Sequence, residues 1–472
     1  MSQSLDTEVA IIGAGTAGLY ALREVRRAKK SFLLIDQGPL GTTCARVGCM
    51  PSKVALHAGA TWQAQQHFDA FGISGANHLS IDTTKAWAEV KRQRDGFAGG
   101  AANSAKRAAG DHLLMGRAEF IDATTLKVTQ ADGTEITVNA KRIIIASGSR
   151  PVLPSWLEAV ADRTITTDQL FELDALPERI GILGLGAIGL EMGLALARLG
   201  IKVVGADIAH TLGGIQDPEL SALAIERFGK EFDFYLGESA EITPHKNGLL
   251  MKAGGKEHKI DLLLASLGRR PNLDTLNIAA AGIPTNERGQ VIYDANTMQV
   301  GDLPIYIVGD INSNRTLMHE AADEGAMAGY NAAQDTPIAF QRKTSIAIAF
   351  TDPDIITVGA GWDTLQEEDI LVGTALGSAN GRCRILGDGS EMLKLYADAN
   401  TGQLLGAAMV GVKAEHLASL IALAIDRKET AHSLMEMPWY HPTVEEMLQS
   451  ALQDIARRIP QEHGLPLGLR KL

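Results

Sequence analysis

The sequence predicts an α/β protein with two repeated strand–turn–helix–strand units and an α+β region at its C-terminal end. Three observations carry this prediction. A Gly-rich turn follows a short apolar strand at residues 13–18, the same order returns at residues 184–189, and the pattern changes to antiparallel strands with helices from about residue 343. In both units the first glycine and an acidic residue are 23 positions apart, from 13 to 36 and from 184 to 207. A repeat of this spacing is a stronger signal than one match.

Length and composition limit the classes of protein to consider. At about 150 residues per domain, 472 residues suggest roughly three domains. The formal net charge of −12 disfavours a phosphate backbone as the main partner, so we expect no nucleic-acid binding. No apolar run approaches about 20 residues, and the first residues lack the pattern of a signal peptide. We therefore expect a cytoplasmic protein without a membrane span, which fits the presence of only three cysteines.

The first unit is expected over residues 1–150. Its elements, in order, are a strand at 8–12, a turn at 13–18, a helix to about residue 29, a strand at 31–35 that ends at Asp36, a hairpin at 132–133 and a buried strand at 143–148. The hairpin is predicted because Asp-Gly between alternating segments favours a tight turn.

The second unit is expected over residues 151–270. Its elements are a strand at 179–183, a turn at 184–189, a helix to about residue 199, a strand at 202–206 that ends at Asp207, hairpins at 247–248 and 254–255, and a buried strand at 262–268. Residues 271–342 return to the first unit with a strand at 305–310, and residues 343–472 form the C-terminal domain.

The glycine pattern has a chemical reason. In a GxGxxG turn the first glycine makes the tight turn, the second admits a pyrophosphate and the third lets the helix pack on the strand. The helix N-terminus then attracts the phosphates, and the acid accepts hydrogen bonds from ribose hydroxyls. The fold class is therefore two Rossmann-like dinucleotide-binding domains plus an α+β domain. Two such turns suggest two dinucleotides, and we expect FAD at one and a nicotinamide cofactor at the other. We expect NAD rather than NADP, because Asp207 would repel the 2′-phosphate of NADP.

Two cysteines, Cys44 and Cys49, lie just after the first acidic residue in the segment GTTCARVGCMPSK, residues 41–53. On a regular helix, five positions separate side chains by about 140°, which is too far for a bond. Gly48 and Pro51 permit an irregular backbone, so a disulfide across a distorted helix start is plausible. Two unrelated core thiols are the alternative. Cys383 has no helper residues in the sequence, and we expect a structural thiol there.

This segment resembles the redox-active disulfide segment of the flavoprotein pyridine nucleotide-disulfide oxidoreductases of class I. The resemblance extends over nearly the whole chain: both Gly-rich turns, the cysteine pair, and the motifs at 268–272, 309–310 and 441–446. It implies that Cys44 exchanges with the substrate, that Cys49 faces the flavin, and that Lys53 lies near the flavin with Glu191 as its ion-pair partner.

The resemblance also implies an acid/base, His441, which Glu446 orients and which reaches the cysteines of the other subunit in a homodimer. Histidine suits this role because its pKa lies near neutrality. The expected FAD-binding residues are Gly13, Gly15, Thr16, Ala17, Gly18, Asp36, Gly41, Thr42, Thr43, Lys53, Ser147, Gly148, Gly309, Asp310, Met318 and His319. The expected NAD-binding residues are Gly184, Gly186, Ala187, Ile188, Gly189, Glu191, Asp207 and Gly268. No metal site is expected.

Departures from the family pattern bear on the substrate. Arg46 replaces a common Asn between the cysteines and would add a positive charge near the thiols, and Trp439-Tyr440 precede His441. Glutathione reductases bind the carboxylates of glutathione with arginines. Arg23 lies at one such position here, but Ala326 occupies a second. The cysteine pair that usually ends mercuric reductases is missing. Asp207 and Ser52 favour the dihydrolipoamide dehydrogenase form, which oxidises dihydrolipoamide or a lipoyl-like dithiol with NAD⁺. The dithiol would be a small molecule or part of a lipoyl domain.

Other functions stay open from the sequence. The same machinery run in reverse would be an NAD(P)H-dependent reductase of another low-molecular-weight or protein disulfide, similar to glutathione or mercuric reductase. Two further alternatives are a flavoprotein without disulfide chemistry and a cofactor-binding scaffold that has lost catalysis. The complete set of Cys44, Cys49, His441 and Glu446 argues against both.

Overall fold

A computed structural model of the chain describes residues 3–366, 369–459 and 469, and its first large feature is a seven-stranded sheet. The strand order is β3-β2-β1-β6-β5-β4, with β17 paired to β6. Strands β3, β2, β1, β6 and β17 are parallel, and β4, β5 and β6 form an antiparallel meander. The bounds are β1 Gln3–Ile12, β2 Phe32–Asp36, β3 Leu113–Met115, β4 Arg117–Phe120, β5 Thr125–Thr129, β6 Glu135–Ile145 and β17 Ile305–Ile307.

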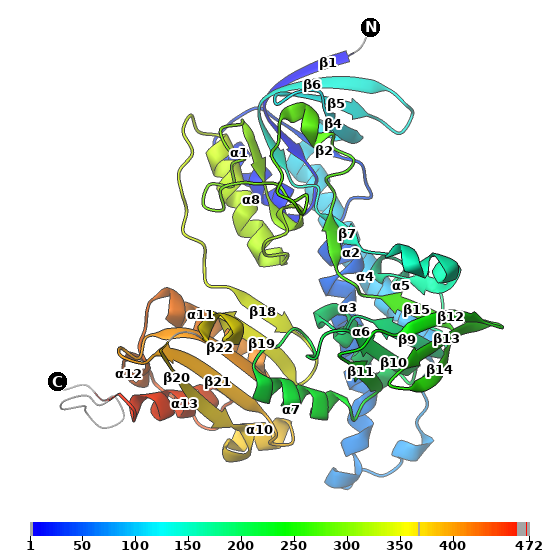
Figure 1. Ribbon diagram of the computed structural model, residues 1–472, viewed down its shortest axis with the longest axis vertical. Helices are drawn as coiled ribbons and strands as arrows, with labels where there is room; N and C mark the ends of the chain where they lie inside the picture. The colour runs from blue at the N-terminus through cyan, green and yellow to red at the C-terminus, as the bar shows by residue number, and fades with distance from the viewer. Residues whose placement is uncertain (1–2, 367–368, 460–468, 470–472) are drawn as a thin grey trace.

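Helices cover this sheet at the top of the molecule (Figure 1). They are α1 Thr16–Arg27 and α8 Met318–Ala332, and the last turns of the long α4 Thr83–Ala109 join them, with Ala105 and Ala109 in the same buried cluster as α1. Helix α8 lies directly against α1, since a Cβ on Gly325 or Gly329 would overlap backbone atoms of Ala17 or Ala21. Strand β17 pairs with β6, so β17 and α8 complete the sheet and helix layers that β1 and α1 begin.

Strand β1 starts earlier than the sequence predicted, at Gln3 rather than at residue 8. Residues 3–7, the first half of β1, are mostly polar and lack the apolar pattern that predicts the strand at 8–12. They form a strand because β6 extends beside them, with Gln3 paired to Ile136.

A second sheet contains the second unit. Its parallel order is β11-β10-β9-β15-β8, and a three-stranded antiparallel sheet, β12-β13-β14, turns at the two predicted hairpins. The strand bounds are β8 Thr164–Ile165, β9 Arg179–Leu183, β10 Lys202–Asp207, β11 Asp233–Leu236, β12 Glu241–His245, β13 Gly248–Ala253, β14 Lys256–Ile260 and β15 Leu262–Ala265. The helices are α5 Thr167–Leu170, α6 Ala187–Arg198 and α7 Pro218–Phe228. A short pair, β7 Ser149–Pro151 with β16 Arg269–Pro271, links the two sheets.

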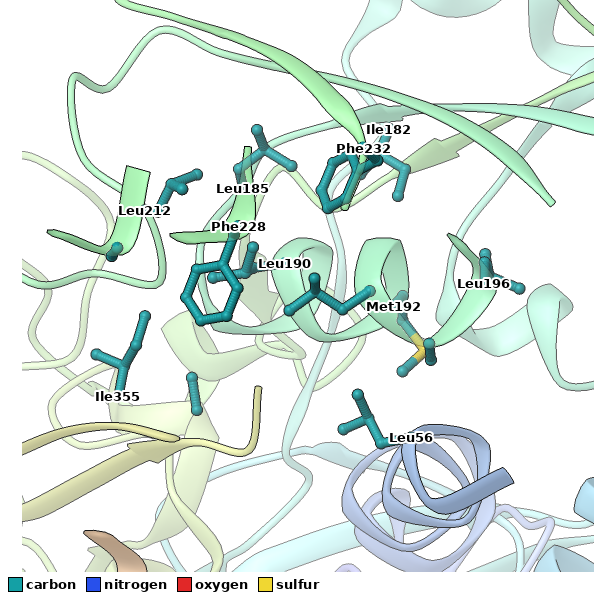
Figure 2. Close-up of a cluster of buried hydrophobic side chains, with 14 of the residues drawn as sticks. Leu56, Ile182, Leu185, Leu190, Met192, Leu196, Leu212, Phe228, Phe232 and Ile355 are labelled. Atoms are coloured by element: carbon teal, nitrogen blue, oxygen red, sulfur yellow. The ribbon is translucent and has the colours of Figure 1, made fainter. Parts of the chain in front are cut away.

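Helix α6 lies at the centre of the molecule's largest apolar core. Figure 2 shows its side chains Leu190 beside Phe228 of the second unit and Met192 toward Leu56 of the cysteine-bearing helix, with Leu196 further along α6. Ile355 of the C-terminal domain belongs to the same buried cluster. Because all three parts of the chain share one core, α6 ties the cysteine segment, the second sheet and the C-terminal domain together.

The C-terminal domain is an antiparallel sheet with helices, as the sequence predicted. Its strand order is β18-β19-β22-β21-β20. The bounds are β18 Ile346–Ala349, β19 Asp354–Gly359, β20 Ile370–Leu376, β21 Met392–Asp398, β22 Leu404–Gly411, α9 Trp362–Leu365, α10 Gly381–Leu386, α11 Ala414–Asp426, α12 Ala431–Met435 and α13 Glu446–Ala456. Cys383 is fully buried there, with its Sγ 3.2 Å from Met447 Sδ. The C-terminal end of the chain, where the sequence has no cysteine pair like that of mercuric reductases, lies mostly outside the described residues.

Within the described residues, none of the helices combines the length and the apolar character that a membrane crossing needs.

Candidate active site

The first Gly-rich turn is packed so tightly that only glycine fits at two of its positions. A Cβ on Gly13 would overlap the Ala146 carbonyl oxygen, and one on Gly18 would overlap the Gly13 carbonyl oxygen. Gly15 faces open space instead. Thr16 and Ala17 begin α1 directly after it, so the free N–H groups of this helix end point toward the space beside Gly15. This arrangement suits an anionic ligand.

A groove runs along this turn. Asp36 lies in it and accepts hydrogen bonds from the N–H groups of Ala14 and Gly38, each at 2.7 Å. The lining combines the residues expected for FAD, from Gly13, Gly15, Asp36, Gly41, Thr42 and Thr43 to Ser147 and Gly148. The open cradle at Gly15 and the acid at the end of β2 fit the diphosphate and ribose of FAD.

The second Gly-rich turn repeats this geometry. A Cβ on Gly184 would overlap the Ser266 carbonyl oxygen, one on Gly189 would overlap that of Gly184, and Gly186 faces open space. Asp207 accepts hydrogen bonds from the N–H groups of Leu185 at 2.6 Å and Ala209 at 2.9 Å. The remaining expected NAD residues flank the turn, with Ala187 and Ile188 at the start of α6 and Gly268 just after β15.

A helix break brings the two cysteines together. Residues 43–63 form two helices, α2 Thr43–Val47 and α3 Cys49–Gln63, which meet at Gly48 with φ −129° and ψ −119°. A Cβ on Gly48 would lie 3.2 Å from the Thr43 carbonyl oxygen and 3.3 Å from Cys44 Cα, which is tighter than usual. The expected distortion at Gly48 is therefore present. Both cysteines are free thiols here, and the side chains of Cys44 and Cys49 hydrogen-bond to each other.

The two thiols differ in acidity. The hydrogen bond to Cys49, burial and the nearby Cys49 charge all raise the pKa of Cys44. The same hydrogen bond from Cys44, together with the Lys53 charge, lowers the pKa of Cys49 to about 7, although burial opposes it. Cys49 is therefore the thiol that carries negative charge near neutral pH.

Lys53 is held by the second unit. Its Nζ lies 2.9 and 2.8 Å from the two carboxylate oxygens of Glu191, which is only 4% exposed. The same Nζ lies 4.7 Å from the centre of the Phe350 ring, and the Phe350 N–H donates to Glu191 at 2.9 Å. The predicted partners Lys53 and Glu191 are thus in contact, and the structure adds Phe350, which lies far from both in the sequence.

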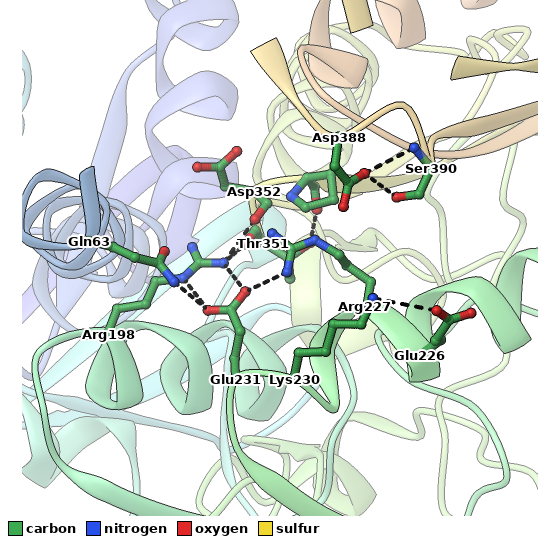
Figure 3. Close-up of polar contacts among 11 residues, drawn as sticks. Gln63, Arg198, Glu226, Arg227, Lys230, Glu231, Thr351, Asp352, Asp388 and Ser390 are labelled. Atoms are coloured by element: carbon green, nitrogen blue, oxygen red, sulfur yellow. Dashed lines mark hydrogen bonds and ion pairs between the residues drawn. The ribbon is translucent and has the colours of Figure 1, made fainter. Parts of the chain in front are cut away.

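Helix α6 makes a second contact with the C-terminal domain at its other end. Figure 3 shows Arg198, whose side chain is 1% exposed, between Glu231 and the backbone of residues 351–352. Its guanidinium donates to both Glu231 oxygens at 2.7 and 2.8 Å and to the Thr351 and Asp352 carbonyl oxygens at 2.8 Å each. Glu191 and Arg198 therefore hold the same loop of the C-terminal domain, two turns apart on one helix.

The turn after β17 is fixed by residues that the sequence analysis missed. Buried Glu324 accepts hydrogen bonds from the N–H of Gly309 and from Asn312, both at 2.7 Å. Ser149 donates to Asp310 at 2.7 Å. Arg269 donates to Ser149 at 2.8 Å. Its position in the motif at 268–272 is the one sequence feature that could have indicated this role.

Met318 and His319, which were also expected to contact FAD, begin α8 and are exposed.

His441 and Glu446 form a pair near the C-terminal end. His441 Nδ1 lies 3.0 Å from Glu446 Oε1, and the Thr443 N–H donates to Glu446 at 3.0 Å. Burial acts to raise the pKa of Glu446, but the Thr443 N–H and His441 hold it below its ordinary value. The His441 side chain is 78% exposed, and its peptide bond to Pro442 is cis. Among the described residues of this single chain, no hydrogen bond or ion pair joins His441 to the cysteines.

Comparisons with known proteins agree with this geometry. Residues 7–325 match the model of a family described as pyridine nucleotide-disulphide oxidoreductase, and residues 345–452 match the dimerisation domain of the same family. The chain belongs to the pyridine nucleotide-disulphide oxidoreductase family. Its members use FAD and NAD(H), so the chain is an FAD-dependent oxidoreductase that acts on disulfides, and its C-terminal domain supports a homodimer.

Curated relatives and solved structures cover almost the whole chain. Dihydrolipoyl dehydrogenases of Geobacillus stearothermophilus and Halobacterium salinarum are each 29% identical, over 95% of this chain and 96% of the relative. The fold is similar to that of LpdA from Mycobacterium tuberculosis, with a TM-score of 0.83 and 22% identity over 96% of this chain and all of the other. It is also similar to a Cu(II) complex of the HOCl-induced flavoprotein disulfide reductase RclA from Escherichia coli, with a TM-score of 0.82 and 24% identity over 96% and 99%.

Proposed function

We propose that this oxidoreductase oxidises dihydrolipoamide, or a lipoyl-like dithiol, with NAD⁺. The observation that carries the proposal is the acidic thiol: Cys49 lies beside Lys53 with its pKa lowered to about 7, while Cys44 keeps its proton. An unequal pair suits dithiol exchange, because one sulfur acts as the leaving thiolate and the other carries the bond to the substrate. The dihydrolipoyl dehydrogenases among the curated relatives support a lipoyl dithiol as substrate.

In this reaction the cysteines, His441 and Lys53 each have a separate role. In the oxidised enzyme Cys44 and Cys49 share a disulfide. His441 of the partner subunit removes a proton from one substrate thiol, and the resulting thiolate attacks Cys44 Sγ. The Cys44–Cys49 bond breaks, a bond forms between Cys44 and the substrate, and Cys49 leaves as a thiolate that Lys53 stabilises. The second substrate thiol attacks the substrate sulfur bound to Cys44. The bond to Cys44 breaks, the cyclic disulfide product leaves, and the proton of the second thiol passes to Cys44 Sγ, which becomes a thiol.

Bound FAD supplies the remaining chemistry, which is the transfer of two electrons from the dithiol to NAD⁺ as a hydride. Glu446 orients the His441 ring and stabilises its protonated form, since its carboxylate lies at hydrogen-bond distance from Nδ1. Asp36 and Asp207 are proposed to bind the two adenosine riboses.

The substrate is tested by comparing initial rates in both directions. We expect the highest kcat/KM with dihydrolipoamide and NAD⁺, or with a dihydrolipoyl protein domain and NAD⁺. NADH or NADPH with oxidised glutathione should be turned over at least a hundred-fold less efficiently. Faster reduction of glutathione, or of another disulfide, would refute the lipoyl assignment and leave the family membership unaffected.

A further inference from the structure

Arg46 is a half-buried cation that forms no ion pair within the described part of the chain. It lies in α2, two positions after Cys44, so its side chain leaves the helix in a different direction from the thiol. Other arginines nearby are paired: Arg94 with Glu172 at 2.6 Å, and Arg117 with Glu119 at 2.7 Å. Within the described part of the chain, no carboxylate lies within ion-pair distance of Arg46. The hydrogen bond from Arg94 lowers the pKa of Glu172, and the Arg46 charge helps to lower it at longer range. Because Glu172 is hydrogen-bonded to Arg94, the Arg46 guanidinium can pair with a further anion.

The side chain of Arg46 is held against the cofactor groove. A Cβ on Gly41 would lie 3.1 Å from Arg46 Cδ and 3.2 Å from Cγ, so the chain at Gly41 touches the aliphatic stem. The same Cβ would lie 2.9 Å from the Ala98 carbonyl oxygen of α4, which limits movement of this loop. Arg94 also reaches the Arg46 carbonyl oxygen at 3.5 Å. Arg46 lines the groove together with Gly13, Ala14 and Gly15.

The groove also decides which anion suits Arg46. At Gly13–Gly15 the free N–H groups of α1 point into it, and the first turn of α1 holds no acidic residue. Helix ends of this kind bind the diphosphate of a dinucleotide. We propose that the Arg46 guanidinium forms an ion pair with the diphosphate of FAD and makes FAD binding dependent on this residue.

This assignment changes the role expected for Arg46. From the sequence, Arg46 was expected to add a positive charge near the thiols. In the structure, the cation that lowers the pKa of Cys49 is Lys53, while Arg46 lines the groove on the other side of α2. The Asn common at this position in the family carries no charge, so the ion pair is a property of this chain rather than of the whole family.

The test measures FAD binding to the apoenzyme. Flavin fluorescence during titration gives the Kd of wild type, Arg46→Asn, Arg46→Lys and the control Arg92→Asn, which removes an exposed guanidinium of α4 that pairs with Glu89 at 2.6 Å and lies outside the groove lining. Charge-assisted hydrogen bonds of this kind change affinity about ten- to hundred-fold. We expect Arg46→Asn to weaken FAD binding by that factor, Arg46→Lys to retain most of the affinity, and Arg92→Asn to bind FAD nearly as wild type.

Two further measurements separate a diphosphate contact from general loss of structure. ADP and adenosine are used as probes of the apoenzyme. Arg46→Asn should weaken ADP binding and leave adenosine binding unchanged, and raising ionic strength should weaken FAD binding more steeply in wild type than in the variant. Equal losses for ADP and adenosine, equal salt dependence, or an unchanged Kd for FAD in Arg46→Asn would each overturn the proposal.

Discussion

At the scale of single residues, the chemistry rests on the unequal pair Cys44 and Cys49. Gly48 breaks the helix between them, so the two thiols hydrogen-bond to each other. That bond and the Lys53 ammonium favour a thiolate on Cys49. Glu191 and Phe350 in turn hold Lys53 in place. The reactivity of one sulfur therefore depends on its own helix segment and on contacts from two distant segments, at Glu191 and at Phe350.

The pair can be tested by spectroscopy of the two-electron-reduced holoenzyme. Cys44→Ser should keep a long-wavelength absorbance band from the Cys49 thiolate beside the flavin, without turnover of dithiol, whereas Cys49→Ser should lack the band. Because the Cys49 pKa is lowered to about 7 in the folded protein, the wild-type band should be complete well above pH 7 and disappear as the pH falls below it. Lys53→Met should move that midpoint to higher pH. A band of full strength in Cys49→Ser would contradict the assignment.

At the scale of elements, helix α6 has two tasks. Its N-terminal end, after the second Gly-rich turn, faces the expected NAD site. Its body holds Glu191 against Lys53 and Arg198 against the loop at 351–352. A shift of α6 would therefore alter both the expected NAD site and the surroundings of the thiol pair.

Removing Arg198 should destabilise the protein strongly. Arg198→Met leaves Glu231 buried without its main partner, and breaking such a pair costs about 3–5 kcal/mol. The double variant Arg198→Met/Glu231→Met should recover part of this loss, because no uncompensated charge stays buried. Urea denaturation followed by circular dichroism compares the variants. If the two single losses simply added in the double variant, the proposed coupling of Arg198 and Glu231 would be wrong.

Asp207 should decide between the two nicotinamide cofactors. Asp207→Ala removes a charge-assisted acceptor, so kcat/KM for NAD⁺ should fall roughly ten- to hundred-fold and the gap to NADP⁺ should narrow. Asp207→Asn keeps an oxygen that can accept the Leu185 N–H and separates loss of charge from loosening of the turn. Steady-state kinetics with both cofactors provide the measurement. A wild-type preference for NADP⁺ would exclude the proposed role.

At the scale of the whole molecule, the thiol pair and the histidine pair occupy different parts of the chain. Figure 1 shows α2 and α3 beside the second sheet, while α12 and α13, which flank His441, lie at the far edge of the C-terminal domain. The match to a family dimerisation domain over residues 345–452 includes His441. A two-fold dimer would place such exposed groups of one subunit at the site of the other.

Mixing two inactive variants tests this arrangement. Cys44→Ser and His441→Ala homodimers should each lack dithiol oxidation. In a purified heterodimer one site carries both lesions and the other carries neither, so activity should return to about half of wild type. Heterodimers verified by mass that stay inactive would refute the shared site. A fully active monomer at low protein concentration would do the same.

The sequence by itself determined the two Gly-rich turns, the following strands and helices, and the change to an antiparallel C-terminal domain. These features depend on local patterns: glycine spacing, apolar strands and Asn-Gly or Asp-Gly turns. The candidate site residues, including the Lys53–Glu191 contact, were predicted from the family resemblance. The domain boundaries and the roles of the site residues stay predictions.

Only the tertiary structure decided what surrounds these residues. Phe350 against Lys53, Arg198 against the loop at 351–352, Glu324 under Gly309, and Arg46 in the cofactor groove leave no periodic signal in the sequence. Phe350 and Lys53 come together only because α3, α6 and β18 pack around one core. Such contacts follow from how distant segments fit together in space, and local patterns of hydrophobicity and glycine carry no information about that fit.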